Sequence, residues 1–163
     1  MKMALKVAIQ KSKDIAVWKE VKDADGNVLA EFKIRGDEYK QYLVALERAQ
    51  NQIASKGYNV ALAGGEDKLY HELLLEAAAC HLIADWKGIT FVENDKEVEV
   101  GYSPENATKL LNMGDIGPII WMFVKDQASK IQIEANKEMV DTLGKLSNST
   151  NIQSDTQDSQ ITK

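Results

Sequence analysis

The segment that most constrains the fold runs from about Glu66 to Trp86, because its apolar side chains would cover most of the circumference of a helix. They are Leu69, Leu73, Leu74, Ala77, Ala78, Leu82 and Ile83. A helix that is apolar nearly all round is stable in water only when other elements surround it. The small residues from Ala77 to Cys80 would also let neighbouring elements approach closely. We therefore predict one helix over 66–86 at the centre of the domain.

Residues 15–35 have the pattern of a β-hairpin. Apolar and polar residues alternate on both arms, and the Asp-Gly pair within Asp23–Asn27 can supply the positive φ that a tight turn needs. The same turn is similar to the start of a calcium-binding loop. That loop requires glycine at its sixth position and glutamate at its twelfth, and here these positions hold Val28 and Ile34. The hairpin is the favoured interpretation.

A second helix and a second hairpin are predicted on either side of the central helix. The helix should be capped by Asp37 and run to about Lys56, because its apolar residues fall on one stripe. These residues are Tyr39, Tyr42, Leu43, Leu46, Ala49 and Ile53. The second hairpin is expected over residues 89–101, with its turn at Asn94-Asp95.

The clearest helix start in the sequence is at Ser103. Its side chain can cap the first free amide groups, Pro104 occupies a position where a missing N–H costs nothing, and Glu105 places a carboxylate at the positive end of the helix dipole. A short amphipathic helix should follow. A long helix is then predicted from near Pro118 to about Leu143.

The composition changes abruptly at Ser147. Residues 147–163 are mainly Ser, Thr, Asn, Gln and Asp, with only Ile152 and Ile161 apolar. Such a segment cannot bury enough surface to offset its ordering entropy, so we expect a disordered tail. Residues 1–146 should form one globular α+β domain. It would be helix-dominated, with an N-terminal β-hairpin, a second short hairpin and a long C-terminal helix.

Composition and charge argue against a nucleic-acid-binding protein and against a membrane-spanning one. A chain of 163 residues with 44% hydrophobic content can bury one core. The net charge is −5 and the lysines are interleaved with Asp and Glu, which argues against nucleic-acid binding. The longest apolar run, Ile119–Val124, is far too short to span a membrane, and the N-terminus lacks the hydrophobic region of a signal peptide. A cytoplasmic location is expected.

Residues that could carry chemistry are few. His71 and His81 would lie about 280° apart around one helix, so they do not share a face. Cys80 is the one cysteine of the sequence, and it would point about 100° away from its neighbour His81. A buried, convergent cluster around these two would favour an enzyme. Without one we expect no catalytic site, no metal and no cofactor.

Two groups of large apolar residues leave structural and functional interpretations open. The run Ile119–Val124 would cover every direction around a helix, whereas a surface helix needs only a stripe. Either this turn is buried among other elements, or Trp121 and Met122 border an exposed patch that holds a partner. Trp86 and Tyr102 flank the second hairpin. They either attach it to the helices or contact a partner directly.

Two motifs follow each other between Ile83 and Leu111. A Trp-x-Gly-Ile segment is followed, after a polar stretch, by Tyr-Ser-Pro-Glu-Asn-Ala-x-x-Leu-Leu. This order resembles the tail assembly chaperones of tailed bacteriophages. The matching positions are Trp86, Gly88, Tyr102, Ser103, Pro104, Glu105, Asn106, Ala107, Leu110 and Leu111. The order of elements over 15–143 follows the family more loosely, and the acidic segment Glu93–Glu99 and the polar tail depart from it.

The resemblance implies a non-enzymatic, ATP-independent factor of the host cell cytoplasm. Such proteins are thought to bind the apolar helices of the tape measure protein and to recruit tail tube subunits. On this basis we predict partner contacts at Trp86, Tyr102, Trp121, Met122 and Phe123. The alternative is a structural component of the tail, such as a tube-associated or tail completion protein. The sequence leaves self-association of the chain open.

Overall fold

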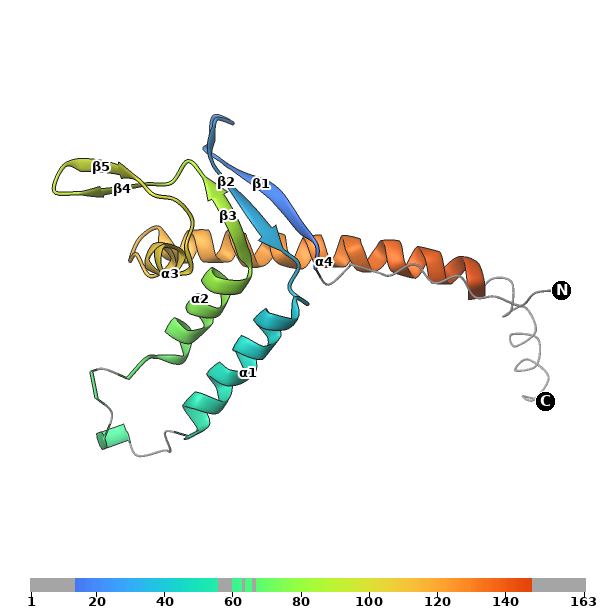
Figure 1. Cartoon of the computed structure of the whole chain (residues 1–163), viewed down its shortest axis with the longest axis horizontal. Coiled ribbons are helices and arrows are strands. Elements are labelled where there is room, and N and C mark those ends of the chain that lie inside the picture. Colours follow the sequence, from blue (N-terminus) through green and yellow to red (C-terminus); the bar gives the residue numbers. More distant parts are fainter. Residues whose placement is uncertain (1–13, 56–59, 63, 66, 148–163) are drawn as a thin grey trace.

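The structure is a computed structural model that describes residues 14–55, 60–62, 64–65 and 67–147. A three-stranded sheet, a pair of helices and a long C-terminal helix meet around a shared core, and a small second hairpin stands at one end (Figure 1). This arrangement confirms the predicted helix-dominated α+β fold. The predicted tail lies outside the described residues, except for Ser147, which ends the last helix.

The first hairpin is formed by β1 (Ala16–Lys22) and β2 (Val28–Arg35), as predicted. At its turn, one carboxylate oxygen of Asp23 accepts hydrogen bonds from the backbone N–H groups of Asp25 and Asn27, each at 2.9 Å. Gly26 has a φ of +85°, a conformation that glycine adopts without steric cost. The acidic turn thus satisfies its own backbone donors.

The third strand of the sheet, β3 (Ile83–Lys87), lies in the segment that was predicted to be helical. It pairs antiparallel with β2, so the strand order is β1-β2-β3. The central helix, α2 (Tyr70–His81), is correspondingly shorter than the prediction of 66–86. The prediction was wrong at both ends, because residues 67–69 are not helical and the helix stops at His81; residue 66 lies outside the described part of the chain.

The physical reason for this difference is pairing with a distant strand. The backbone N–H of Arg35 donates to the carbonyl of Leu82 at 2.8 Å, and Phe32 lies directly opposite Trp86. A short apolar run cannot be assigned to helix or strand from periodicity alone. Residues 83–87 form a strand because they pair with the free edge of β2, whose backbone groups would be costly to leave unpaired when buried. The core position of α2 itself is as predicted, since Ala78 and Ala79 are fully buried.

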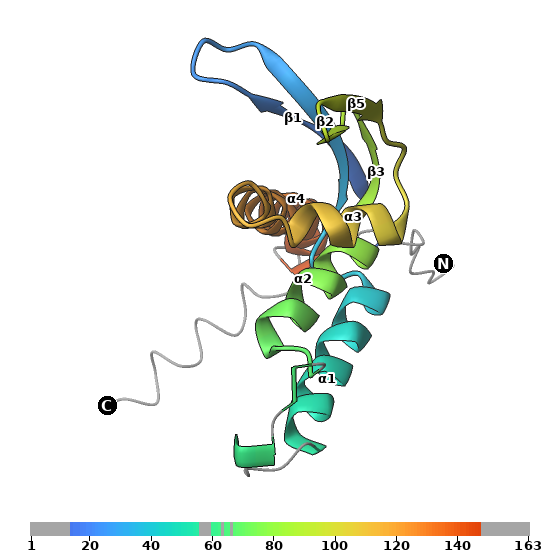
Figure 2. The same ribbon diagram turned by 90° about the vertical axis from the view of Figure 1, so that its left-hand side faces the viewer.

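Two helices, α1 (Lys40–Ser55) and α2, lie side by side and extend away from the sheet (Figures 1 and 2). A short 3₁₀ helix, η1 (Val60–Leu62), belongs to the connection between them. α1 begins after Tyr39, whose carbonyl accepts the N–H of Leu43, and not directly after Asp37. Its predicted end at residue 56 lies outside the described residues.

The second hairpin is formed by β4 (Thr90–Glu93) and β5 (Lys96–Glu99), as predicted, and is a separate two-stranded sheet. Asn94 and Asp95 have φ values of 52° and 62°. Two consecutive positive φ angles are typical of the turn that best matches the twist of a hairpin.

Two helices complete the described part of the chain, and the predicted start of the first is confirmed. In α3 (Pro104–Leu111) the hydroxyl oxygen of Ser103 accepts the N–H of Asn106 at 3.0 Å. The last helix, α4 (Gly117–Ser147), begins close to its predicted start and is longer than predicted. It runs past β1 and β2, and its C-terminal turns extend beyond the other elements (Figure 1).

The core lies between the sheet and the helices, where α4 crosses the sheet and α2 and α3 close the remaining sides. Its most completely buried large side chains are Phe32, Ile34, Leu82, Ile83, Leu111 and Val124. α1 adds Tyr42 to the core, and Phe91 of the second hairpin packs against it. The second hairpin is therefore attached through Phe91 and through its flanking residues Ile89 and Val100.

Candidate functional site

Trp86 lies in the core. Its side chain is 4% exposed, and its indole N–H donates to the carbonyl of Val100 at 2.7 Å. Its ring makes edge-to-face contacts with Phe32 and Tyr102, with centroid distances of 6.1 and 5.5 Å. We refer to Phe32, Trp86 and Tyr102 as the aromatic cluster. Through it, β3 is tied to the segment that follows the second hairpin.

Tyr102 is half-buried beside Trp86. Its hydroxyl group donates to the carbonyl of Ala79 at 3.2 Å, which connects the start of α3 to α2. Burial raises the pKa of Tyr102, so the phenol remains a proton donor at neutral pH. In this conformation the apolar surfaces of the two predicted contact residues, Trp86 and Tyr102, pack inside the domain. This agrees with the interpretation that they attach the second hairpin to the rest of the domain.

Trp121 is partly buried between α4 and α2. Its ring lies 5.1 Å from the ring of His71 at an interplanar angle of 90°, and the Nζ atom of Lys125 lies 4.6 Å from its centroid. Its indole N–H is buried and has no hydrogen-bond acceptor among the described residues. Most buried donors are paired, so this one is unusual.

The apolar run from Ile119 to Val124 is divided between the core and the surface. Ile120 and Val124 are 8% and 0% exposed, whereas Ile119 and Met122 are 64% and 68% exposed. Phe123 is half-buried, and its ring lies 6.3 Å from that of Phe32. One part of the run is therefore buried among other elements, and another part is exposed, so each of the two interpretations applies to some of its residues.

Ile119, Ile120 and Phe123 of this run line an apolar groove of about 570 Å³, whereas the exposed Met122 is not part of the lining. The groove lies between the turn end of the first hairpin, β4, the end of α3 and the start of α4. It is lined by Val21, Lys22, Leu29, Ala30, Phe32, Gly88, Ile89, Thr90, Phe91, Val92, Leu110, Met113, Ile116, Ile119, Ile120 and Phe123. Lys22 is the one charged residue in this lining.

The rim of the groove is unusually apolar for a surface. Leu29 is 59% exposed, Val92 67%, Ile116 46% and Ile119 64%, and they come from four different segments. Single exposed aliphatic residues are common, but a contiguous group around a hollow typically marks an interaction site. The groove is therefore the candidate functional site.

Three of the four exposed rim residues were not singled out from the sequence: Leu29, Val92 and Ile116. Leu29 follows the turn of the first hairpin, Val92 lies in an acidic hairpin, and Ile116 stands between Gly114 and Gly117. An aliphatic residue beside a polar turn is a weak signal of exposure. No local pattern could have indicated that the three lie around one hollow, because only the fold brings them together.

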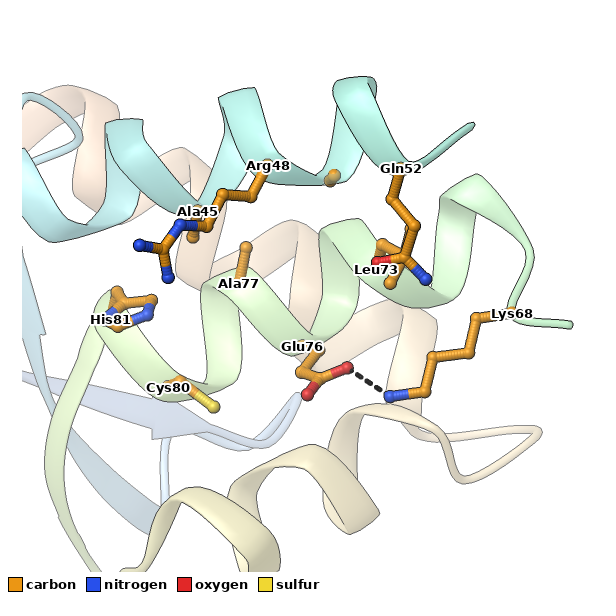
Figure 3. Close-up of a pocket in the computed structure, with 10 residues that line it drawn as sticks. Ala45, Arg48, Gln52, Lys68, Leu73, Glu76, Ala77, Cys80 and His81 are labelled. Carbon is orange, nitrogen blue, oxygen red and sulfur yellow. Dashed lines mark hydrogen bonds and ion pairs between the residues drawn. The ribbon is translucent and has the colours of Figure 1, made fainter. Parts of the chain in front are cut away.

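A second hollow, the polar pocket, lies between α1 and α2 (Figure 3). It has a volume of about 370 Å³ and contains the charged or titratable residues Arg48, Lys68, Glu76, Cys80 and His81. The Nζ atom of Lys68 donates to a carboxylate oxygen of Glu76 at 2.7 Å. This pair is exposed, so it contributes little to stability.

The polar pocket does not pair Cys80 with His81 as a nucleophile and its base. The thiol lies 3.8 Å from the hydroxyl oxygen of Thr108 on α3, whereas the His81 ring turns toward Arg48 (Figure 3). Burial raises the pKa of the Cys80 thiol, and desolvation followed by the charge of Arg35 lowers the pKa of His81. A protonated thiol is a weak nucleophile. The convergent cluster that would favour an enzyme does not form here.

Two searches of the described residues bear on other kinds of site. No group of three or more His, Cys, Asp or Glu side chains in the described segments is arranged to hold a metal ion. Among the helices of the same segments, none combines the length and apolar character that crossing a membrane requires.

Comparison with known proteins gives one match. The family model described as YdaY prophage protein covers residues 37–145, which include α1 through most of α4. No curated protein and no solved structure matches the chain. The match agrees with the phage association implied by the resemblance described above. Since it spans more than half of the 163 residues, the chain belongs to the YdaY prophage protein family.

Proposed function

We propose that this protein is a non-enzymatic, ATP-independent phage tail assembly chaperone of the host cytoplasm. In this role it binds apolar helical segments of the tape measure protein in the apolar groove and keeps them soluble until tail tube subunits replace it. Release by competition requires no nucleotide site.

The observation that carries the proposal is the exposed apolar rim of the groove. Its aliphatic side chains are supplied by both hairpins, by the α3–α4 connection and by α4, and each is about half exposed or more. Covering such a surface with an apolar partner is favourable by roughly 25 cal/mol per Å² of buried area. A helix laid into a groove is a common way to do so.

Two further observations support the phage context. The chain belongs to a prophage protein family, and its Trp86-to-Leu111 motifs resemble those of tail assembly chaperones. The net charge of −5 is also compatible with a carrier that keeps an apolar client in solution.

The proposal is tested by co-expressing the protein with the tape measure and tail tube proteins encoded beside it and measuring co-purification. The double variant Ile116→Ser/Ile119→Ser, which changes two exposed residues of the groove rim, should lose the tape measure protein. The matched control is Ile133→Ser/Val140→Ser, which changes residues of similar exposure, 64% and 59%, further along α4. The control should retain binding. Equal retention by both variants would contradict a client site at the groove.

Mass spectrometry of purified virions separates this function from the alternative of a structural tail component. A chaperone should be missing from finished particles, whereas a tube-associated or completion protein should be present in a fixed ratio to other tail proteins. Stoichiometric presence would overturn the proposed function.

A further inference from the structure

The outer side of α4 carries large apolar residues at a regular spacing. Among the side chains of this helix that the structure describes, the large apolar ones that are more than half exposed are Ile119, Met122, Ile133 and Val140. All of them lie on one repeat of alternating three- and four-residue steps, whose remaining positions are Asp126, Ser129 and Asn136. This is the repeat by which one α-helix packs lengthwise against another. We refer to these residues together as the α4 seam.

The α4 seam is a narrow stripe on a side of the helix that the domain leaves open. At about 100° per residue, Met122, Ser129, Ile133 and Val140 lie within an arc of about 40°. The buried Ile131 lies about 180° from Met122. The elements that α4 contacts therefore lie on the opposite side, and Figure 2 shows them above, below and to the right of the helix, which is seen nearly end-on. Single exposed apolar residues are common, but a continuous stripe is typical of an interaction surface.

The α4 seam is complementary to a second copy of itself. When two copies run antiparallel, its positions pair as Met122 with Val140, Asp126 with Asn136, and Ser129 with Ile133. Two-fold symmetry repeats each pair, so a large apolar pair closes each end of the contact. The carboxylate faces an amide, which is able to donate a hydrogen bond to it. A parallel pairing would instead place Asp126 opposite its own copy, where the like charges repel.

We propose that this protein forms an antiparallel homodimer through the α4 seam, with the two-fold axis level with residue 131. This inference goes beyond the proposed function, because most of the seam lies away from the apolar groove. Ile119, at one end of the seam, is the residue that the two surfaces share. Since the groove lies at the start of α4, an antiparallel dimer carries its two grooves near opposite ends of the paired helices.

The polar middle of the seam makes the contact specific rather than strong. Asp126 enters it as a neutral pair with Lys130, since the Nζ atom lies 2.9 Å from a carboxylate oxygen. The amide of Asn136 is partly buried and lies 3.4 Å from both carboxylate oxygens of Glu38, at the edge of the seam that faces the domain. Polar residues at such positions fix the register of two helices and reduce the stability of their contact.

The length of the seam sets the expected affinity. From Met122 to Val140 it extends for about 27 Å, at 1.5 Å per residue. A contact of this length between two helices belongs with interfaces below about 1,200 Å², which are typical of transient complexes. We therefore expect a monomer–dimer equilibrium with a Kd of about 10–100 μM.

The test is sedimentation velocity of the full chain from about 5 to about 500 μM, a range that brackets the expected Kd. Wild-type protein should change from monomer to dimer over this range. Ile133→Ser/Val140→Ser should raise the Kd by at least about tenfold, because each lost side chain is lost twice in a symmetric dimer.

The matched control is Leu29→Ser/Val92→Ser, which changes two residues of similar exposure on the rim of the apolar groove. It should dimerise like the wild type. Loss of the dimer in the control with retention in Ile133→Ser/Val140→Ser would mean that the groove is the interface, and would overturn the inference. So would a monomer at every concentration. Thermal unfolding of both variants confirms that they are folded.

Disulfide trapping tests the orientation of the two helices. Met122→Cys and Val140→Cys are made separately in a Cys80→Ser background and oxidised with glutathione disulfide, alone and mixed. Because Met122 lies opposite Val140 of the second copy in the antiparallel register, only the mixture should give a covalent dimer. A covalent dimer from either variant alone, with no additional product in the mixture, would show a parallel pairing and overturn the inference.

These outcomes separate the inference from the proposed function. A dimer that binds no tape measure protein would leave the α4 seam standing and refute the chaperone function. Co-purification of the tape measure protein with a chain that is monomeric at every concentration would do the reverse.

Discussion

The aromatic cluster and the apolar groove are neighbouring regions built from similar residues, and they differ in how completely they are covered. Phe32 and Trp86 in the cluster are 1% and 4% exposed. Leu29 and Val92 on the rim of the groove are 59% and 67% exposed. Both regions are built from large apolar side chains and share β2, and Phe32 belongs to both, so the type of side chain does not explain the difference.

The difference comes from where the strands end. β2 pairs with β3 from Glu31 to Ile34, and its first residues, Val28 to Ala30, extend beyond that pairing. The chain leaves the sheet at Gly88, where a Cβ atom would lie 3.1 Å from the carbonyl oxygen of Leu29. Past this point β2 still pairs with β1, but no described strand pairs with its other edge. The groove therefore lies where apolar side chains that continue from the core are left uncovered, because the pairing of β2 with β3 has ended.

Removing Trp86 should produce the largest effect and would sharpen the contrast. We expect Trp86→Ala to lower the free energy of unfolding by about 3–5 kcal/mol, because a large buried ring is lost and the carbonyl of Val100 loses its donor. Urea denaturation measures the loss. The control Trp18→Ala changes a ring that is 36% exposed and should cost about 1 kcal/mol. Equal losses would contradict a structural role specific to Trp86.

Gly117 should matter next, because it sets the angle between α3 and α4 at the base of the groove. A Cβ atom there would collide with the carbonyl group of Leu111. We expect Gly117→Ala to destabilise the domain by roughly 1–3 kcal/mol. Gly114→Ala is the control, since nothing lies within 4 Å of a Cβ atom at that position. Thermal unfolding of the two variants compares them, and a neutral Gly117→Ala would mean that the helix junction is loosely packed.

Local features of the fold could be predicted from the sequence because their causes are local. The turn at Asp23–Asn27 and the cap at Ser103 depend on residues within a few positions of each other. β3 could not be predicted, because Ile83 to Lys87 become a strand only through pairing with β2. The same dependence on distant partners explains why the predicted helix continued through Trp86.

The candidate site was less predictable than the fold. Large aromatic residues suggested partner contacts, but size alone does not distinguish a buried ring such as Trp86 from an exposed one. Phe123 was identified from the density of the apolar run and lines the groove, whereas Met122, from the same run, is exposed and does not line it. Leu29 and Val92 belong to the site only because two hairpins meet there, which no single segment of sequence encodes.

Substitutions on the rim of the apolar groove test the second of the two compared regions, because they should affect binding far more than stability. We expect Ile116→Ser/Ile119→Ser to change the free energy of unfolding by about 0.5 kcal/mol or less per site, since exposed positions away from the core are usually tolerant. Urea denaturation beside wild-type protein measures this. A loss comparable to that of Trp86→Ala would mean that the rim is part of the core, and the contrast would fail.

The smallest expected effect is a pH dependence of stability that arises at His81, the last residue of α2. Desolvation, and then the charge of Arg35, lower the pKa of His81 from its ordinary value of 6.5 in the folded protein. Above that value the ring is neutral in both states, so it favours neither. As the pH falls below 6.5, the unfolded chain binds a proton more readily than the folded one. Stability therefore decreases until the pH passes the folded pKa.

The variant His81→Gln isolates this contribution, because every carboxylate titrates equally in both proteins. Between pH 7.5 and pH 5.5 the free energy of unfolding measured by urea denaturation should fall more for the wild type than for the variant, by a fraction of a kcal/mol, since the ring is only partly buried. An equal fall in the two proteins would refute the shift. Binding at the groove should not follow this titration, because its lining contains no histidine. A groove affinity that changed together with His81 would show that the two regions are coupled, and they could then no longer be treated as separate parts of the molecule.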